Sequence, residues 1–132
     1  MNILFFLRPK SGVTYLTLGN SLRQGLEKMK SSCYTEIPVV DKDGNFVGTV
    51  SQGDFLWKIL DESFTDMQMA ERTPIDSLVS KRNAPVRINT TMEELLSKAV
   101  EQNFVPVIDD FGAFVGIITR KAIIKYFAEK KA

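Results

Sequence analysis

The sequence has no histidine, a single cysteine and almost no excess charge, and each shortage excludes a class of function. Without histidine, the chain cannot form a Ser-His or Cys-His catalytic pair. Cys33 alone supports neither a disulfide framework nor a Cys/His zinc site. The formal net charge is +1, with acids and bases interspersed, which argues against a nucleic-acid-binding surface. We therefore expect no metal and no nucleic-acid partner.

Several familiar signals are also missing. No Gly-x-Gly-x-x-Gly occurs, and Gly44–Gly48 lacks the Lys-Ser/Thr that completes a phosphate-binding loop. The apolar run Ile3–Leu7 stops at Arg8, far short of the roughly 20 residues that span a bilayer. We therefore expect no enzymatic activity, no cofactor and no membrane association, and a cytoplasmic protein.

The stretch from Tyr34 to Leu60 contains the pattern that organises the chain. Two short runs rich in β-branched residues flank a polar Asp-Lys-Asp-Gly segment, which predicts a β-hairpin. Ser51 then precedes apolar residues spaced as on one face of a helix, which predicts a capped helix. These apolar residues are Phe55, Leu56, Ile59 and Leu60.

The same pattern recurs 68 residues later, from Val105 to Ile124. The positions that recur in register are Pro38 and Pro106, Asp41 and Asp109, Gly44 and Gly112, Gly48 and Gly116, and the hydroxyl residues Ser51 and Thr119. Self-similarity at a fixed spacing predicts two structural units. The carboxylate pairs at Asp41 and Asp109 fall in the predicted turns, where side-chain to backbone hydrogen bonds explain them.

This doubled pattern resembles the cystathionine-β-synthase (CBS) domain pair, or Bateman module, over about Val13–Leu60 and Ala84–Lys131. The most specific part is Pro-Val-x-Asp followed by Gly-x-x-[Ser/Thr]-x-x-Asp, which the first copy contains intact. The resemblance implies an α+β fold of two tandem repeats, each β-α-β-β-α, packed with pseudo-two-fold symmetry. We place the first repeat with an N-terminal strand at residues 1–60, a linker at 61–73 and the second repeat at 74–132.

The other predicted elements follow from caps and breakers. Ser21 is a plausible N-cap for a helix to about Lys30, with Leu22, Leu26 and Met29 as its core stripe. Strands are expected at Val13–Leu16 and Val86–Ile88. A short helix is expected at Ile75–Ser80 because Pro74 suits a first turn. Two more helices are expected, one capped by Thr90 or Thr91 and one from Thr119 to about Glu129.

Ser51 and Asp54 have two possible roles. Ser-x-x-Asp at a helix start approximates a capping box, which needs no ligand. In the family that this chain resembles, the same two residues hold the ribose hydroxyls of an adenine nucleotide. The helix N-terminus beside them also favours an anion such as phosphate. Both roles can hold at once.

The second copy departs from this pattern. It keeps Thr119, but Ala122 stands where the first copy has Asp54, and Arg120 and Lys121 precede it. Two cations at a helix N-terminus oppose the helix dipole, which indicates an anionic partner, although a solvated surface is the alternative. The Thr-Arg-Lys stretch is similar to Thr-Arg-Arg in small CBS proteins that bind cyclic di-AMP.

The resemblance therefore implies a regulatory module that binds AMP, ADP, ATP or cyclic di-AMP in clefts between the repeats and signals to a separate effector protein. The ligand-binding residues that it implies are Lys10, Val13, Ile37, Pro38, Ser51, Asp54, Val105, Pro106, Thr119, Arg120 and Lys121. The helices carry more apolar surface than a thin core can cover, which predicts a homodimer. The alternative function is a dimerisation or interaction scaffold that binds no small molecule.

Overall fold

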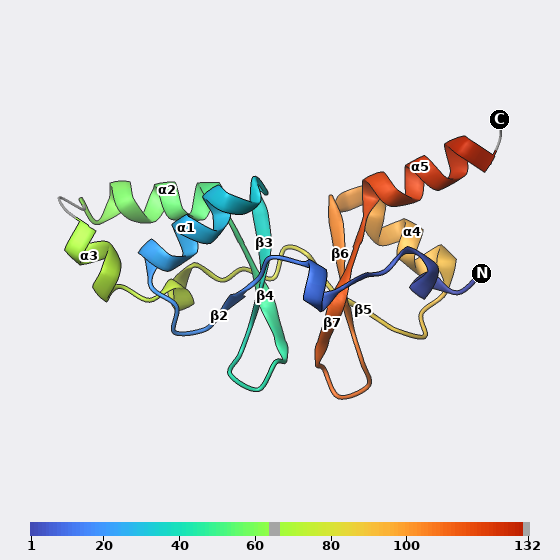
Figure 1. Ribbon diagram of the computed structural model, residues 1–132, viewed down its shortest axis with the longest axis horizontal. Helices are drawn as coiled ribbons and strands as arrows, with labels where there is room; N and C mark the ends of the chain where they lie inside the picture. Colours follow the sequence, from blue (N-terminus) through green and yellow to red (C-terminus); the bar gives the residue numbers. More distant parts are fainter. Residues whose placement is uncertain (64–66, 131–132) are drawn as a thin grey trace. The chain divides into compact units, whose positions relative to one another are not determined.

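The computed structural model describes residues 1–63 and 67–130, which form two compact units (Figure 1). We call Thr14–Arg82 the first-repeat unit. The second-repeat unit combines Met1–Val13 with the chain from Asn83 onward. Part of the predicted linker, residues 64–66, and the last two residues of the predicted second repeat lie outside the described residues.

The first-repeat unit has a three-stranded sheet in the order β2-β3-β4. β2 is parallel to β3, and β3 and β4 form the predicted antiparallel hairpin. Helices α1 and α2 lie on the same face of this sheet (Figure 1). The elements are β2 (Leu16–Thr17), α1 (Leu22–Ser32), β3 (Glu36–Val40), β4 (Phe46–Ser51), α2 (Gln52–Asp61), α3 (Met67–Arg72) and the 3-10 helix η3 (Ile75–Leu78).

The second-repeat unit has a four-stranded sheet in the order β1-β7-β6-β5. β5 is parallel to β6, and β6 and β7 form the second hairpin. The elements are the 3-10 helix η1 (Ile3–Phe6), β1 (Arg8–Pro9), the 3-10 helix η2 (Lys10–Gly12), β5 (Val86–Arg87), α4 (Met92–Glu101), β6 (Phe104–Ile108), β7 (Phe114–Thr119) and α5 (Arg120–Lys130).

The predicted β-α-β-β-α order is confirmed in both units, as β2-α1-β3-β4-α2 and β5-α4-β6-β7-α5. Each unit also has its own cluster of buried apolar side chains. Leu22, Ile37 and Phe55 are among those of the first unit, and Leu95 and Ile118 among those of the second. The strands and helices that the repeat predicts therefore supply the buried side chains of each core.

Two local predictions were wrong, on the strand at Val13 and on the helix after Pro74, and the predicted linker contains a helix that the sequence period does not indicate. Val13 is not in a strand, because only Leu16–Thr17 pairs with β3. The predicted linker contains helix α3, whose Ala70 is buried in the first-repeat core. Packing against that core stabilises this helix, although its sequence shows no helical period. The helix after Pro74 is a 3-10 helix that ends at Leu78.

The N-terminal segment differs most from the predicted boundaries. Residues 1–13 pack with the second repeat, because Ile3 and Phe6 are buried in its core and β1 pairs with β7. The segment before the second repeat behaves in the corresponding way. Ser80 forms an isolated bridge with Thr49 of β4, in the first-repeat unit. The stretch that precedes each repeat in sequence therefore extends the sheet of the other repeat.

Several helices keep apolar side chains in solvent. On α2, Phe55 is buried, but Leu56 and Leu60 of the predicted core face are 54% and 58% exposed. Trp57, which lies off that face, is 63% exposed. On α5, Ile124 is 60% exposed. Among the described residues, no helix is long and apolar enough to cross a membrane.

Candidate functional site

The end of β4 and the start of α2 bring Ser51 and Asp54 together in a complete capping box. The Asp54 N–H donates to Ser51 Oγ at 3.2 Å, and the Ser51 N–H donates to Asp54 Oδ2 at 2.8 Å. The predicted capping role is therefore confirmed. Helix α1 begins with the same arrangement between Ser21 and Gln24, so this geometry alone does not indicate a ligand.

Two residues that the sequence analysis does not single out complete this cluster. The Arg82 guanidinium lies between two carboxylates, with Nη2 at 2.7 Å from Asp54 Oδ2 and 2.9 Å from Glu36 Oε2. The hairpin register explains why Glu36 is there, since it pairs with Ser51 across β3 and β4. Knowing that register would have placed Glu36 beside the helix start. Nothing in the sequence pattern pairs Arg82 with it.

The ion pair shifts the pKa of both Asp54 and Arg82 toward their charged forms. Burial of the Asp54 carboxyl favours the neutral form, but hydrogen bonds from Arg82 and Ser51 outweigh it and hold the pKa of Asp54 below its ordinary value. In turn, the hydrogen bond to Asp54 raises the pKa of Arg82.

The matching position of the second repeat has a different chemistry. Thr119 Oγ1 accepts from the Ala122 N–H at 3.1 Å, which preserves half of the capping box. Ala122 has no carboxylate to return the bond. The residue across the hairpin from Thr119 is Phe104, where the first repeat has Glu36. This site therefore lacks both acidic side chains that surround the start of α2.

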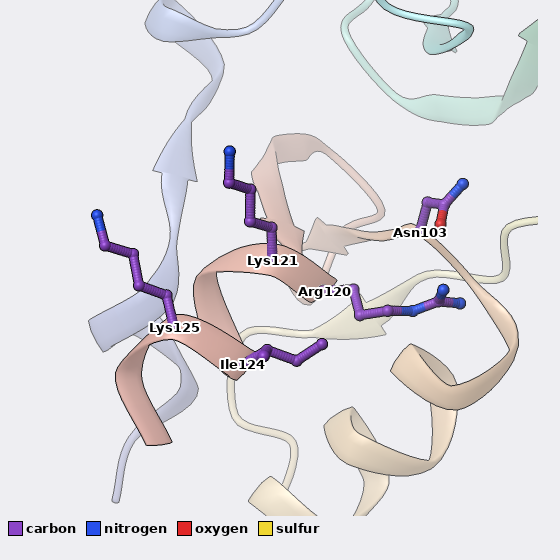
Figure 2. Close-up of a pocket in the computed structure, with 5 residues that line it drawn as sticks. All are labelled: Asn103, Arg120, Lys121, Ile124 and Lys125. Atoms are coloured by element: carbon purple, nitrogen blue, oxygen red, sulfur yellow. The ribbon is translucent and has the colours of Figure 1, made fainter. Parts of the chain in front are cut away.

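The two cations that follow Thr119 point in different directions (Figure 2). Arg120 donates from Nε to the Ala99 carbonyl at 2.7 Å and from Nη2 to the Val100 carbonyl at 3.3 Å. These carbonyls belong to the last turn of α4, where a cation is favoured by the helix dipole. The position of Arg120 thus has a structural explanation that needs no anion. Lys121 extends from the other side of α5.

A groove of about 520 Å³ lies beside these residues, on the second-repeat unit. Its lining consists of Asn103, Arg120, Lys121, Ile124 and Lys125 (Figure 2). Lys121 and Lys125 are one helical turn apart, exposed, and extend from the same side of α5. Asn103 and Lys125 were not predicted from the sequence. The spacing of Lys121 and Lys125 on one helix was the available signal.

The remaining predicted residues fall into the two units as follows. Ile37 and Pro38 are buried in β3 with Ser51 and Asp54 in the same unit. Val105 and Pro106 are buried in β6 of the second-repeat unit. Lys10 and Val13 belong to that unit as well, in and just after η2. A ligand contact of each of these residues remains a prediction.

Comparison with known proteins gives a consistent result. The family model described as CBS domain matches residues 7–61 and 75–129. The crystal structure of CbpB in complex with c-di-AMP is 29% identical in sequence, with a TM-score of 0.89. That match covers 98% of this chain and 85% of CbpB.

Two curated proteins are also similar. Cyclic di-AMP receptor B of Bacillus subtilis (strain 168) is 22% identical over 91% of this chain and 82% of its own length. The chloroplastic CBS domain-containing protein CBSX2 of Arabidopsis thaliana is 23% identical over 91% of this chain, which spans 60% of that protein. A structure of CBSX2 in complex with AMP shares the fold at 23% identity, with a TM-score of 0.80 over 99% of this chain and 98% of that one.

Proposed function

Because this chain belongs to the CBS-domain family, we propose that it is a regulatory module that binds an adenine nucleotide and signals to a separate effector protein. The observation that carries the proposal is the ionised carboxylate of Asp54 beside the Ser51 hydroxyl at the start of α2. A carboxylate accepts hydrogen bonds from the two vicinal hydroxyls of a ribose. The relatives named above bind c-di-AMP or AMP.

The second-repeat unit supplies a complementary chemistry. Its groove has no carboxylate among its lining residues and has two exposed lysines, Lys121 and Lys125. Ammonium groups on one side of a helix suit a phosphate, while the apolar Ile124 in the same groove suits an aromatic base. We therefore assign ribose binding to the first repeat and phosphate binding to Lys121 and Lys125, with Arg120 held by α4.

Calorimetric titration with AMP, ATP and cyclic di-AMP tests the proposal. Asp54→Ala should weaken binding about ten- to a hundredfold, because one charged hydrogen-bond acceptor is worth roughly 1.5–3 kcal/mol. Gln24→Ala is the matched control, since it removes the same position of the α1 capping box in the same unit. It should cost about 1 kcal/mol of stability and leave nucleotide affinity unchanged.

The outcomes separate ligand binding from capping. If both variants lose similar stability and Asp54→Ala binds every nucleotide as tightly as wild type, the ribose role is wrong. A second pair of variants addresses the phosphate. Lys121→Ala with Lys125→Ala should weaken phosphorylated ligands, with a larger effect at low salt, and leave adenosine unaffected.

A second candidate function is a scaffold that binds no small molecule. It is favoured by the complete capping box, which already satisfies Asp54, and by the exposed apolar side chains of α2, including Trp57. We propose that these side chains form a homodimer interface in either case, because exposed apolar patches of this kind mark interfaces. A wild-type protein that dimerises and shows no heat of binding with any adenine nucleotide would favour the scaffold.

A further inference from the structure

Arg82 is held in place from two sides. Its backbone follows Ser80, which exchanges two hydrogen bonds with Thr49 of β4, at 2.8 and 2.9 Å. Its guanidinium is bound by Glu36, which accepts from Nε at 3.2 Å and from Nη2 at 2.9 Å. Glu36 is fixed in turn, since the same oxygen accepts from the Thr49 hydroxyl at 3.0 Å. The guanidinium therefore has a defined position beside Asp54.

The oxygens of Asp54 are largely occupied in this arrangement. Oδ2 accepts the Ser51 N–H at 2.8 Å and Arg82 Nη2 at 2.7 Å, which uses both of its lone pairs. Oδ1 accepts a longer hydrogen bond from Arg82 Nη1, at 3.4 Å, so the guanidinium contacts both oxygens of the carboxylate. A vicinal diol donates two hydrogens and needs acceptor capacity on both oxygens. The diol and the guanidinium therefore compete for one carboxylate.

We propose that Arg82 is an internal latch on the first repeat, whose guanidinium occupies the Asp54 carboxylate until the hydroxyls of a ribose displace it. The inference rests on the proposed function, since it concerns the same site. Glu36 keeps hold of the released guanidinium through Nε, so the cation stays beside the bound nucleotide. Arg82 lies in the segment that leads from Ser80 to β5.

Adenosine is the probe that tests the latch, because it carries the diol and no phosphate. Arg82→Gln should bind adenosine about three- to tenfold more tightly than wild type, since the lost competitor is a partly exposed ion pair whose side chains are 46% and 21% exposed. Lys81→Gln is the matched control. It makes the same charge change one residue away and should leave adenosine affinity unchanged.

Salt gives a second readout that needs no variant. Ions screen the pair between Arg82 and Asp54, so wild-type affinity for the uncharged adenosine should rise as salt increases from 0.05 to about 0.5 M. Arg82→Gln should show no such rise. If Arg82→Gln does not fold, as judged by circular dichroism, the wild-type salt series and Arg82→Lys, which keeps a charge but cannot bridge two carboxylates, decide the question.

The possible results are distinct. Tighter adenosine binding by Arg82→Gln, with Lys81→Gln unchanged, supports the latch. Equal or weaker binding by Arg82→Gln, or a flat salt response of wild type, overturns the latch and leaves the proposed function standing. If none of the three proteins binds adenosine or any adenine nucleotide, both the proposed function and the latch are overturned.

Discussion

Gly116 in β7 is the residue on which the attachment of the N-terminal segment depends. A Cβ at this position would lie 2.2 Å from the Arg8 carbonyl oxygen and 2.9 Å from Leu7 Cδ1, and the residue has φ of 154°. A flexible side chain could rotate away from a new Cβ, but the Arg8 carbonyl oxygen can move only if the backbone of β1 moves. We therefore expect Gly116→Ala to separate β1 from β7.

The energetic consequence follows from what the segment buries. Ile3 is 0% exposed and Phe6 is 8% exposed, and exposing each costs about 1.5–3 kcal/mol. The freed segment regains conformational entropy, which offsets part of this loss. We expect Gly116→Ala to lower the free energy of unfolding by about 2–4 kcal/mol. Urea denaturation gives this value directly.

Limited proteolysis shows whether the segment is released. Trypsin should cleave after Lys10 much faster in Gly116→Ala than in wild type, because β1 and η2 no longer protect it. Gly112→Ala in the same hairpin is the control. Its Cβ would meet nothing within 4 Å, so only the left-handed backbone (φ +88°) costs energy, about 1–2 kcal/mol. Equal stability and equal cleavage at Lys10 in wild type and Gly116→Ala would refute the argument.

Three further predictions concern single contacts. Arg120→Ala should lower stability by about 1 kcal/mol in urea denaturation, because two α4 carbonyls lose their donor, whereas Lys121→Ala should not. Asp54 has a lowered pKa, so its charge stabilises the fold above pH 4. The stability difference between wild type and Asp54→Asn should accordingly be full near pH 7 and shrink as pH falls below about 4. Light scattering should give twice the chain mass of 14.9 kDa for wild type and a shift toward that mass for Trp57→Glu.

The repeated elements were predictable because their signals are local. Turn chemistry at Asp41 and Asp109 and the hydroxyl caps at Ser51 and Thr119 each act over a few residues, and all of them appear where the sequence places them. The turn role of Asp41 is confirmed by its hydrogen bonds from the Asp43 and Asn45 N–H groups. A duplicated pattern doubles each local signal, which is why the element order could be read without the structure.

What the sequence did not predict depends on contacts between residues far apart in the chain. The pairing of Arg8 with Ile117 joins two ends of the chain, and the ion pair of Arg82 with Glu36 spans 46 residues. No turn, cap or period encodes such a contact. Gly48 and Gly116 indicate such contacts indirectly, because a glycine within a strand allows another backbone to approach closely. In both cases a backbone carbonyl lies where a Cβ would be.

Gly48 and Gly116 make the same kind of backbone contact in the two units, whereas the side chains that follow these contacts differ. A Cβ at Gly48 would lie 2.3 Å from the Ser80 carbonyl oxygen, and one at Gly116 would lie 2.2 Å from that of Arg8, so a backbone segment packs against both hairpins at the matching position. Two residues beyond these contacts, the segments differ in chemistry. In the first-repeat unit this residue is Arg82, which forms ion pairs with Asp54 and Glu36. In the second-repeat unit it is Lys10, and the positions that match Asp54 and Glu36 are Ala122 in α5 and Phe104 in β6. Of the two matching sites, the start of α2 has the Asp54 and Glu36 carboxylates, and the start of α5 has Ala122 and Phe104 at those positions. A ribose diol would therefore compete with Arg82 for the Asp54 carboxylate at the first repeat. At the second repeat, Ala122 offers no carboxylate for a diol to bind.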